Sequence, residues 1–162
     1  KGVLLDYWSP SSTTHAIVCT ENGLGRIDLK QLKWDWLSQV RPINDCVVTD
    51  LQADGKRKVL LAKHDGYLLV YDDAGALTHS VLLGTPVRAV AAVPLNAGGH
   101  TVVAALPGRL LDLGNDLTGR DVVAVGEYHR LAAPGRPGVL LAFGNGAVID
   151  AFTLEPRQSS TR

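Results

Sequence analysis

Histidines next to carboxylates are the first residues in this sequence whose types could support chemistry. His64 and Asp65 are adjacent, and a carboxylate can orient an imidazole for acid–base catalysis. However, neighbouring residues of a strand point to opposite faces, and this pair falls on a tight turn. We therefore interpret it as part of the turn. The five histidines lack the spacing of metal ligands; they are His15, His64, His79, His100 and His129.

Other catalytic patterns are also missing from the sequence. It contains no glycine-rich phosphate loop of the Walker or dinucleotide-binding type. It contains no serine in a Gly-x-Ser-x-Gly setting, which would mark a hydrolase. We therefore predict no catalytic residue from the sequence.

Tryptophans are the second group with a chemical use. Trp8, Trp34 and Trp36 could form an aromatic platform for a sugar or for a partner chain. Because large aromatic side chains also fill protein cores, packing between sheets is the alternative interpretation. We take these three residues as candidate partner-binding residues and keep packing open.

Composition limits the classes of partner. The chain has 162 residues, of which 46% are hydrophobic and 20% charged, as expected for a folded globular protein. Sixteen basic residues balance sixteen acidic ones, so we expect no nucleic-acid partner. No apolar stretch is long enough to span a bilayer. We expect Cys19 and Cys46 to be buried strand residues, with a disulfide and the redox compartment left open.

The elements that must position these residues follow a repeat. Four apolar runs each end in a turn pair with glycine and are followed by a second apolar run, which is the pattern of a β-hairpin. The glycines are Gly23, Gly66, Gly108 and Gly146, and they lie 43, 42 and 38 residues apart. Further strand candidates flank each hairpin, so each unit of roughly 40 residues holds about four short strands.

This repeat predicts an all-β fold of four antiparallel units. We place the units at residues 1–41, 42–84, 85–125 and 126–154, with a polar tail at 155–162. One segment is ambiguous, because Leu29, Leu32 and Trp36 are also spaced as on a helix. The repeat favours a strand there. The last unit lacks its fourth strand, since the residues that follow its third strand are polar and include Pro156.

One segment allows a comparison with known repeats. Residues 49–75 contain Asp50, an Asp54-Gly55 turn, an apolar strand, an Asp65-Gly66 turn and a second apolar strand. This order resembles the FG-GAP/VCBS and the quinoprotein-like (PQQ-like) β-propeller repeats, whereas WD repeats are less similar. The resemblance is good over the second unit and weak over the other three. It implies a β-propeller, or part of one, whose fold alone assigns no activity.

The resemblance also implies a metal-binding loop. FG-GAP repeats hold calcium in the aspartate-rich loop between their first two strands, and this loop carries Asp50, Gln52 and Asp54 at alternate positions. Calcium prefers six or more oxygen ligands, so backbone and water would have to supply the rest. Aspartate and glycine are also ordinary turn residues, and a plain turn is the favoured interpretation. We predict no other cofactor.

The unfinished last unit leaves three arrangements open. The chain could close as a small four-bladed ring, two copies could pair into a larger ring, or the chain could be part of a longer propeller. The sequence contains no methionine, even at position 1, which favours the third arrangement.

These observations lead to two functional hypotheses. The first is a non-enzymatic binding or scaffold module that engages a protein or carbohydrate partner through its loops. The protein partner could be a second copy or the remaining propeller segments. The alternative is the propeller portion of a polysaccharide-degrading or quinoprotein-type enzyme. We expect a secreted or periplasmic protein, because the resembling repeats are common there.

Overall fold

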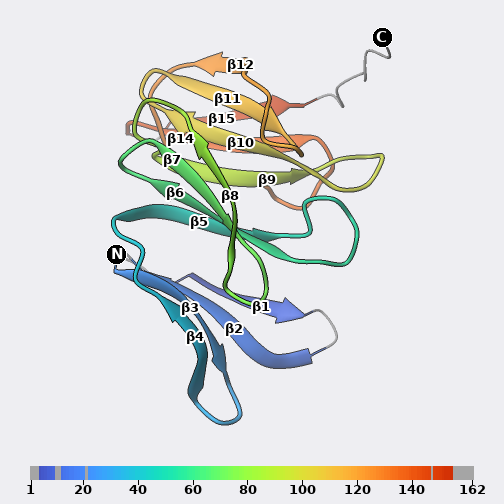
Figure 1. Ribbon diagram of the computed structural model, residues 1–162. Helices are drawn as coiled ribbons and strands as arrows, with labels where there is room; N and C mark the ends of the chain where they lie inside the picture. The colour runs from blue at the N-terminus through green and yellow to red at the C-terminus, as the bar shows by residue number, and fades with distance from the viewer. Residues whose placement is uncertain (1–3, 10–11, 21, 147, 155–162) are drawn as a thin grey trace.

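The computed structural model describes residues 4–9, 12–20, 22–146 and 148–154, with side chains described from His15 onward. Every regular element in these ranges is a β-strand, and the strands form four separate antiparallel sheets (Figure 1). Each sheet is a meander in which strands adjacent in the sequence pair with one another. The all-β prediction is confirmed. No helix in the described residues is long and apolar enough to cross a membrane.

The strands of each sheet follow one another along the chain. Sheet 1 contains β1 (Leu4–Ser9), β2 (Ser12–Thr20), β3 (Gly23–Asp28) and β4 (Lys33–Ser38). Sheet 2 contains β5 (Ile43–Thr49), β6 (Lys58–Lys63), β7 (Tyr67–Tyr71) and β8 (Leu77–Leu82). Sheet 3 contains β9 (Ala89–Pro94), β10 (His100–Leu106), β11 (Arg109–Gly114) and β12 (Asp121–Val125). In the described part of the chain, sheet 4 contains β13 (Tyr128–Ala132), β14 (Val139–Gly144) and β15 (Ile149–Thr153).

The structure answers two questions left open by the sequence, namely the conformation of the segment with helical spacing and the state of the two cysteines. The segment with helical spacing forms a turn at residues 29–32 followed by β4, so the strand prediction is confirmed. Cys19 and Cys46 are buried thiols in the same apolar cluster and are not joined by a disulfide.

The hairpin glycines are required for two different reasons, a positive φ angle or the close approach of another strand. Gly66, Gly108 and Gly146 have φ of 88°, 77° and 75°, a region that favours glycine. The first hairpin differs, because Gly23 is not among the residues with positive φ. A Cβ atom at Gly23 would lie 2.8 Å from the carbonyl oxygen of Ser38, so close approach of β4 requires the glycine there. At this hairpin the glycine is therefore needed for space rather than for a left-handed backbone.

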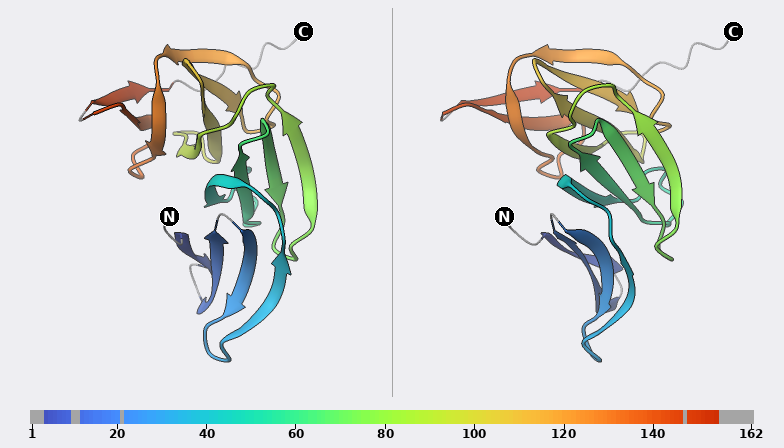
Figure 2. Two further views of the ribbon diagram at one scale, coloured as in Figure 1. Left: turned by 90° about the vertical axis from the view of Figure 1, so that its left-hand side faces the viewer. Right: turned by 60° about the vertical axis from the view of Figure 1, so that its left-hand side comes forward.

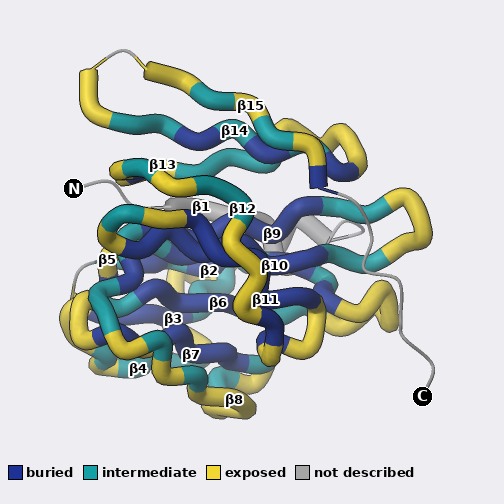
Figure 3. The backbone as a smooth tube through the Cα atoms, turned by 90° about the horizontal axis from the view of Figure 1, so that it is seen from above, coloured by how far each residue is buried: buried dark blue, intermediate teal, exposed yellow. Residues whose placement is uncertain are grey.

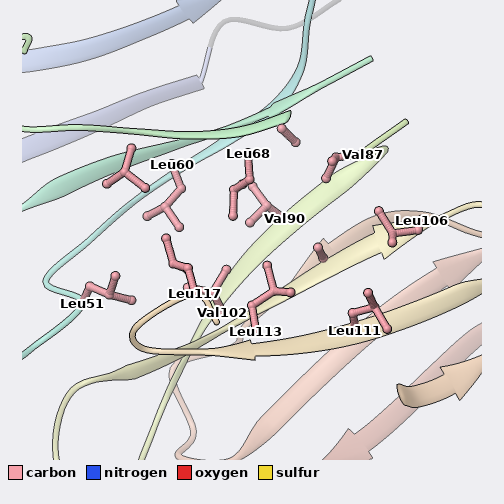
Figure 4. Close-up of a cluster of buried hydrophobic side chains, with 13 residues drawn as sticks. Leu51, Leu60, Leu68, Val87, Val90, Val102, Leu106, Leu111, Leu113 and Leu117 are labelled. Carbon is pink, nitrogen blue, oxygen red and sulfur yellow. The ribbon is translucent and has the colours of Figure 1, made fainter. Parts of the chain in front are cut away.

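The core consists of three apolar clusters, each between two neighbouring sheets. Successive side chains of a strand point to opposite faces, so each strand of a middle sheet contributes side chains to two clusters. In β6, Val59 and Leu61 pack toward sheet 1, whereas Leu60 and Ala62 pack toward sheet 3. The cluster between sheets 2 and 3 also contains Leu68, Val90, Val102 and Leu113 (Figure 4). Continuous apolar runs therefore form strands that are buried on both faces.

The four sheets are arranged as an open arc. Figure 2 shows sheets 1 and 4 at the two ends of the arc, with sheets 2 and 3 between them. The first strands of neighbouring sheets lie next to each other, with contacts between β1 and β5, β5 and β9, and β9 and β13. Viewed from above, the exposed residues lie mainly along outer strands such as β8 and β12 and at the β14–β15 hairpin (Figure 3). The described sheets do not close as a four-bladed ring.

Candidate interaction sites

A cleft of about 230 Å³ lies between sheets 2 and 3. The β5–β6 loop, β8 and the β11–β12 loop line it. Its apolar lining consists of Leu51, Val70 and Leu117, all of which are buried. Polar and charged side chains make up the rest, namely Gln52, Asp54, Lys56, Lys58, Thr78, His79, Asn115 and Asp116. Three buried apolar residues among eight polar or charged ones would suit one apolar side chain of a partner with polar contacts around it.

The β5–β6 loop is held in place by its own aspartates. The Asp50 carboxylate accepts hydrogen bonds from the backbone N–H of Asp54 (3.1 Å) and of Gly55 (2.8 Å). The Asp54 carboxylate accepts one from the backbone N–H of Lys56 (2.9 Å). The imidazole Nδ1 of His100 lies 2.8 Å from the carbonyl oxygen of Asp50, which links the loop to sheet 3. These contacts present Lys56 at a defined position beside the cleft.

The loop across the cleft is held in a similar way. The Asp116 carboxylate accepts hydrogen bonds from the backbone N–H (3.0 Å) and the hydroxyl (2.8 Å) of Thr118. Leu117 has φ of 63°, and its carbonyl oxygen accepts a hydrogen bond from the Arg120 guanidinium (3.1 Å). Non-glycine residues seldom adopt this conformation, so the surrounding contacts hold Leu117 in the cleft lining.

The three predicted metal ligands separate into two places. Gln52 and Asp54 line the cleft, whereas Asp50 lines the groove on the inner side of the arc and bonds to its own loop. Within the described part of the chain, no group of three or more His, Cys, Asp or Glu side chains could hold a metal ion. Calcium binding by Asp50, Gln52 and Asp54 stays a prediction.

The tryptophans do not form one platform. Trp34 pairs with Ile27 and Trp36 pairs with Arg26, with an irregularity between the two pairs at Asp35. Because Ile27 and Arg26 are consecutive, the two indoles lie on opposite faces of sheet 1. The Trp36 indole donates to the carbonyl oxygen of Asp73 in sheet 2 (3.1 Å), whereas Trp34 is 47% exposed. The side chain of Trp8, in β1, lies outside the described residues.

The histidine–aspartate pair lies on the β6–β7 turn, as expected. His64 is exposed, and the Asp65 carboxylate lies 2.7 Å from the Lys63 ammonium. Burial acts to raise the pKa of Asp65, but the hydrogen bonds from Lys63 and from the Tyr67 N–H outweigh it and hold the pKa below its usual value. The geometry therefore makes Asp65 the partner of a lysine rather than the orienting group of a catalytic imidazole.

A groove of about 620 Å³ runs along the inner side of the arc, a feature that the sequence did not indicate. Residues of β5, β9 and β13 line it. Asp45 is the half-buried carboxylate in this lining, and it accepts hydrogen bonds from the backbone N–H of Val90 (3.0 Å) and of Cys46 (2.9 Å). Burial raises its pKa above the ordinary value, while the two N–H donors and the charge of Arg130 act in the opposite direction. No motif marks Asp45, because its partner Val90 belongs to another sheet.

Comparison with known proteins identifies the fold. The sequence matches no protein-family model and no curated protein. The structure is similar to the β-propeller domain of Myceliophteria thermophila Cps50 (Swd1), with a TM-score of 0.68 and 17% identity over 93% of this chain and 50% of that one. It is also similar to BBS1N in complex with ARL6DN (soaked with mercury), with a TM-score of 0.66 and 16% identity over 90% of this chain and 48% of that one.

These similarities establish an all-β fold of the β-propeller type. The chain spans about half the length of the propeller chains that it matches. The four sheets therefore correspond to consecutive blades, and the open arc corresponds to part of a ring.

Proposed function

We propose that this chain is a protein-binding β-propeller segment that engages its partner through the loops around the cleft between sheets 2 and 3. The cleft is the observation that carries this proposal. Its apolar lining of Leu51, Val70 and Leu117 would accept an apolar side chain of the partner, while the loops around it would contact the flanking residues. The repeat type, FG-GAP or quinoprotein-like, is part of the proposal and rests on the Asp-Gly turns of sheet 2.

The charges at the cleft indicate the kind of partner segment. Lys56 and Lys58 carry positive charge, and Asp54 and Asp116 carry negative charge. A segment with one apolar anchor flanked by both acidic and basic residues would match this arrangement. Among the similar structures, BBS1N is a propeller chain in complex with the protein ARL6DN, which supports a protein rather than a small molecule as the partner.

Binding at the cleft can be tested by blocking it. We expect Gln52→Trp, which places an indole at the cleft, to reduce partner affinity at least tenfold, or about 1.4 kcal/mol. The matched control is Gln39→Trp, an exposed glutamine in the β4–β5 connection. A photo-crosslinking residue at Lys56 would first capture the partner, with the same residue at Leu82 on the outer strand as the reference. Titration calorimetry with the purified partner then measures both variants.

Two results would contradict the proposal. The captured protein could crosslink equally well from Leu82 as from Lys56, which would place binding elsewhere on the surface. Alternatively, it could bind Gln52→Trp and the unmodified chain with equal affinity.

A further inference from the structure

Sheet 1 has an apolar face that no other described sheet covers. The register places Val18, Ile27, Trp34 and Leu37 on one side of the sheet, opposite the cluster shared with sheet 2. Trp34 is 47% and Leu37 is 58% exposed. We call these four residues the open face of sheet 1. No charged residue lies on this face among the described side chains at the paired positions of β2, β3 and β4.

The Trp34 indole lies over Gly25 on this open face. A Cβ atom at Gly25 would be only 2.7 Å from the indole ring, so the ring rests directly on the backbone of β3. Charged groups of the same sheet, such as Arg26 and Asp35, pair with each other at 2.7 Å. The Arg26 guanidinium also donates to the carbonyl oxygen of Asp73 in sheet 2 (3.1 Å). The sheet therefore directs its charges toward sheet 2 and leaves the opposite face apolar.

Sheet 4 has an equivalent face at the other end of the arc. Val139, Leu141, Phe143 and Ile149 share one side of the sheet, while Leu140 and Ala142 pack in the cluster with sheet 3. Ile149 is 59% exposed, and the other three are half-buried. We call these four residues the open face of sheet 4. Arg130, paired with Phe143, is its one charged residue at the described paired positions.

The two open faces have the composition of the faces that are already packed. Every covered interface in this molecule joins one sheet to the next through apolar side chains. Leaving two such faces in water is unfavourable, because transfer of apolar surface from water to an apolar contact lowers the free energy. The natural occupant of each face is therefore another sheet of the same kind.

We infer that a second copy of this chain covers both faces. The open face of sheet 1 in one copy packs on the open face of sheet 4 in the other, and a two-fold axis generates the same contact again. Three observations support a second copy. The chain spans about half of the propellers it resembles, the arc leaves its two ends apart (Figure 2), and the net charge of zero gives no repulsion between copies.

The paired arrangement also completes a site. Each copy contributes four sheets, so the ring would contain twice that number, within the range of roughly four to eight blades found in propellers. The inner groove along β5, β9 and β13, which carries Asp45, is open on one side in a single copy. The inner strands of the second copy would enclose it as a channel. This inference does not depend on partner binding at the cleft.

Light scattering coupled to size-exclusion chromatography tests the inference. We expect the 162-residue chain to have about twice its mass of 17.2 kDa, and this value to stay constant as concentration rises, because a closed ring has no free ends. Trp34→Asp and Ile149→Asp each introduce a charge into one open face and should weaken dimerisation at least tenfold. Gln52→Trp at the cleft should leave the mass unchanged.

Mixing the two variants is a sharper test. A Trp34→Asp chain keeps its sheet 4 face, and an Ile149→Asp chain keeps its sheet 1 face, so an equimolar mixture should recover dimers through one intact contact. Circular dichroism confirms that each variant is folded. If Trp34→Asp is not, Leu37→Gln replaces it at the same face.

Three outcomes would overturn the inference. A chain that stays monomeric at all concentrations would mean that something other than a second copy covers the faces. Steadily growing oligomers would show that the contact does not close. A dimer unaffected by Trp34→Asp, Leu37→Gln and Ile149→Asp would place the interface elsewhere.

Discussion

Asp45 shows how contacts from another sheet change the chemistry of a single residue. It lies half-buried in an inner strand, and its carboxylate connects β5 to β9 through the Val90 N–H. Burial raises its pKa above the ordinary 3.8, so the folded protein holds a proton at this site more readily than the unfolded chain does.

This pKa shift predicts a particular pH dependence of stability. Between the ordinary and the raised pKa, the folded state binds more protons, so the contribution of Asp45 to the free energy of unfolding falls as pH rises. We expect the stability of the unmodified protein relative to Asp45→Asn to increase as pH is lowered from 7 toward 4. Urea unfolding at a series of pH values measures this difference.

The control for this experiment is Asp73→Asn, which removes one carboxylate at an exposed position of the β7–β8 turn. The measured quantity is the free energy of unfolding of the unmodified protein minus that of Asp45→Asn. If this quantity is constant over the pH range, or decreases toward pH 4, the raised pKa of Asp45 is contradicted.

In strand β4, one extra residue changes which side chains lie on each face of the sheet. Trp34 and Trp36 are two residues apart, which in a regular strand places them on one face. The irregularity at Asp35 changes this, so Trp36 packs toward sheet 2 and Trp34 lies on the open face. Trp34 and Trp36 lie in the predicted strand but on opposite faces, so they do not share one platform; partner binding by Trp8, Trp34 and Trp36 stays a prediction.

This geometry predicts that deletion of Asp35 is tolerated. Without it, Trp34 and Trp36 become adjacent residues of a regular strand and stay on opposite faces. The cost is the ion pair with Arg26, roughly 1 kcal/mol for a partly exposed pair, together with the contact of His15 with the same carboxylate (3.4 Å). The matched control is deletion of Val18 from β2. Because β2 pairs with β3 without a bulge, this deletion would shift the register by one residue and move the side chains on one side of the deletion to the opposite face of the sheet.

Urea unfolding monitored by tryptophan fluorescence compares the two deletions. We expect cooperative unfolding with a small loss of stability for the Asp35 deletion, and loss of the folded state for the Val18 deletion. Similar behaviour of the two deletions would refute the role assigned to Asp35.

At the scale of the whole molecule, stability is distributed unevenly along the arc. Within a single copy, sheets 2 and 3 are covered on both faces, whereas sheets 1 and 4 each have one face that only a second copy would cover, and sheet 4 has three strands in the described residues. Local opening requires less free energy where fewer apolar contacts must be broken.

Amide hydrogen exchange should follow this distribution. We expect the slowest exchange in β6, β7, β10 and β11, and faster exchange in β4 and β15, which are outer strands of the terminal sheets. Mass spectrometry of peptides from the labelled protein measures this order. Equal protection of β15 and β10 would mean that the edge of sheet 4 is paired with another strand.

The sequence by itself determined the secondary structure of this protein and much of its order along the chain. Hairpin turns and period-two apolar runs depend on neighbours within a few residues, so Asp65-Gly66 and the strands beside it could be predicted locally. The continuous apolar runs of β6 and β10 agree with their burial on both faces, which we did not predict from the sequence.

Only the tertiary structure decided which side chains meet. The cleft between Leu51 and Leu117 and the contact of Asp45 with Val90 join residues from different sheets, and the position of Trp34 on the open face of sheet 1 depends on a bulge. The cleft and the Asp45–Val90 contact connect positions more than 40 residues apart, and they depend on how the sheets stack along the arc. No local pattern encodes that stacking, because propensity and periodicity describe each strand alone.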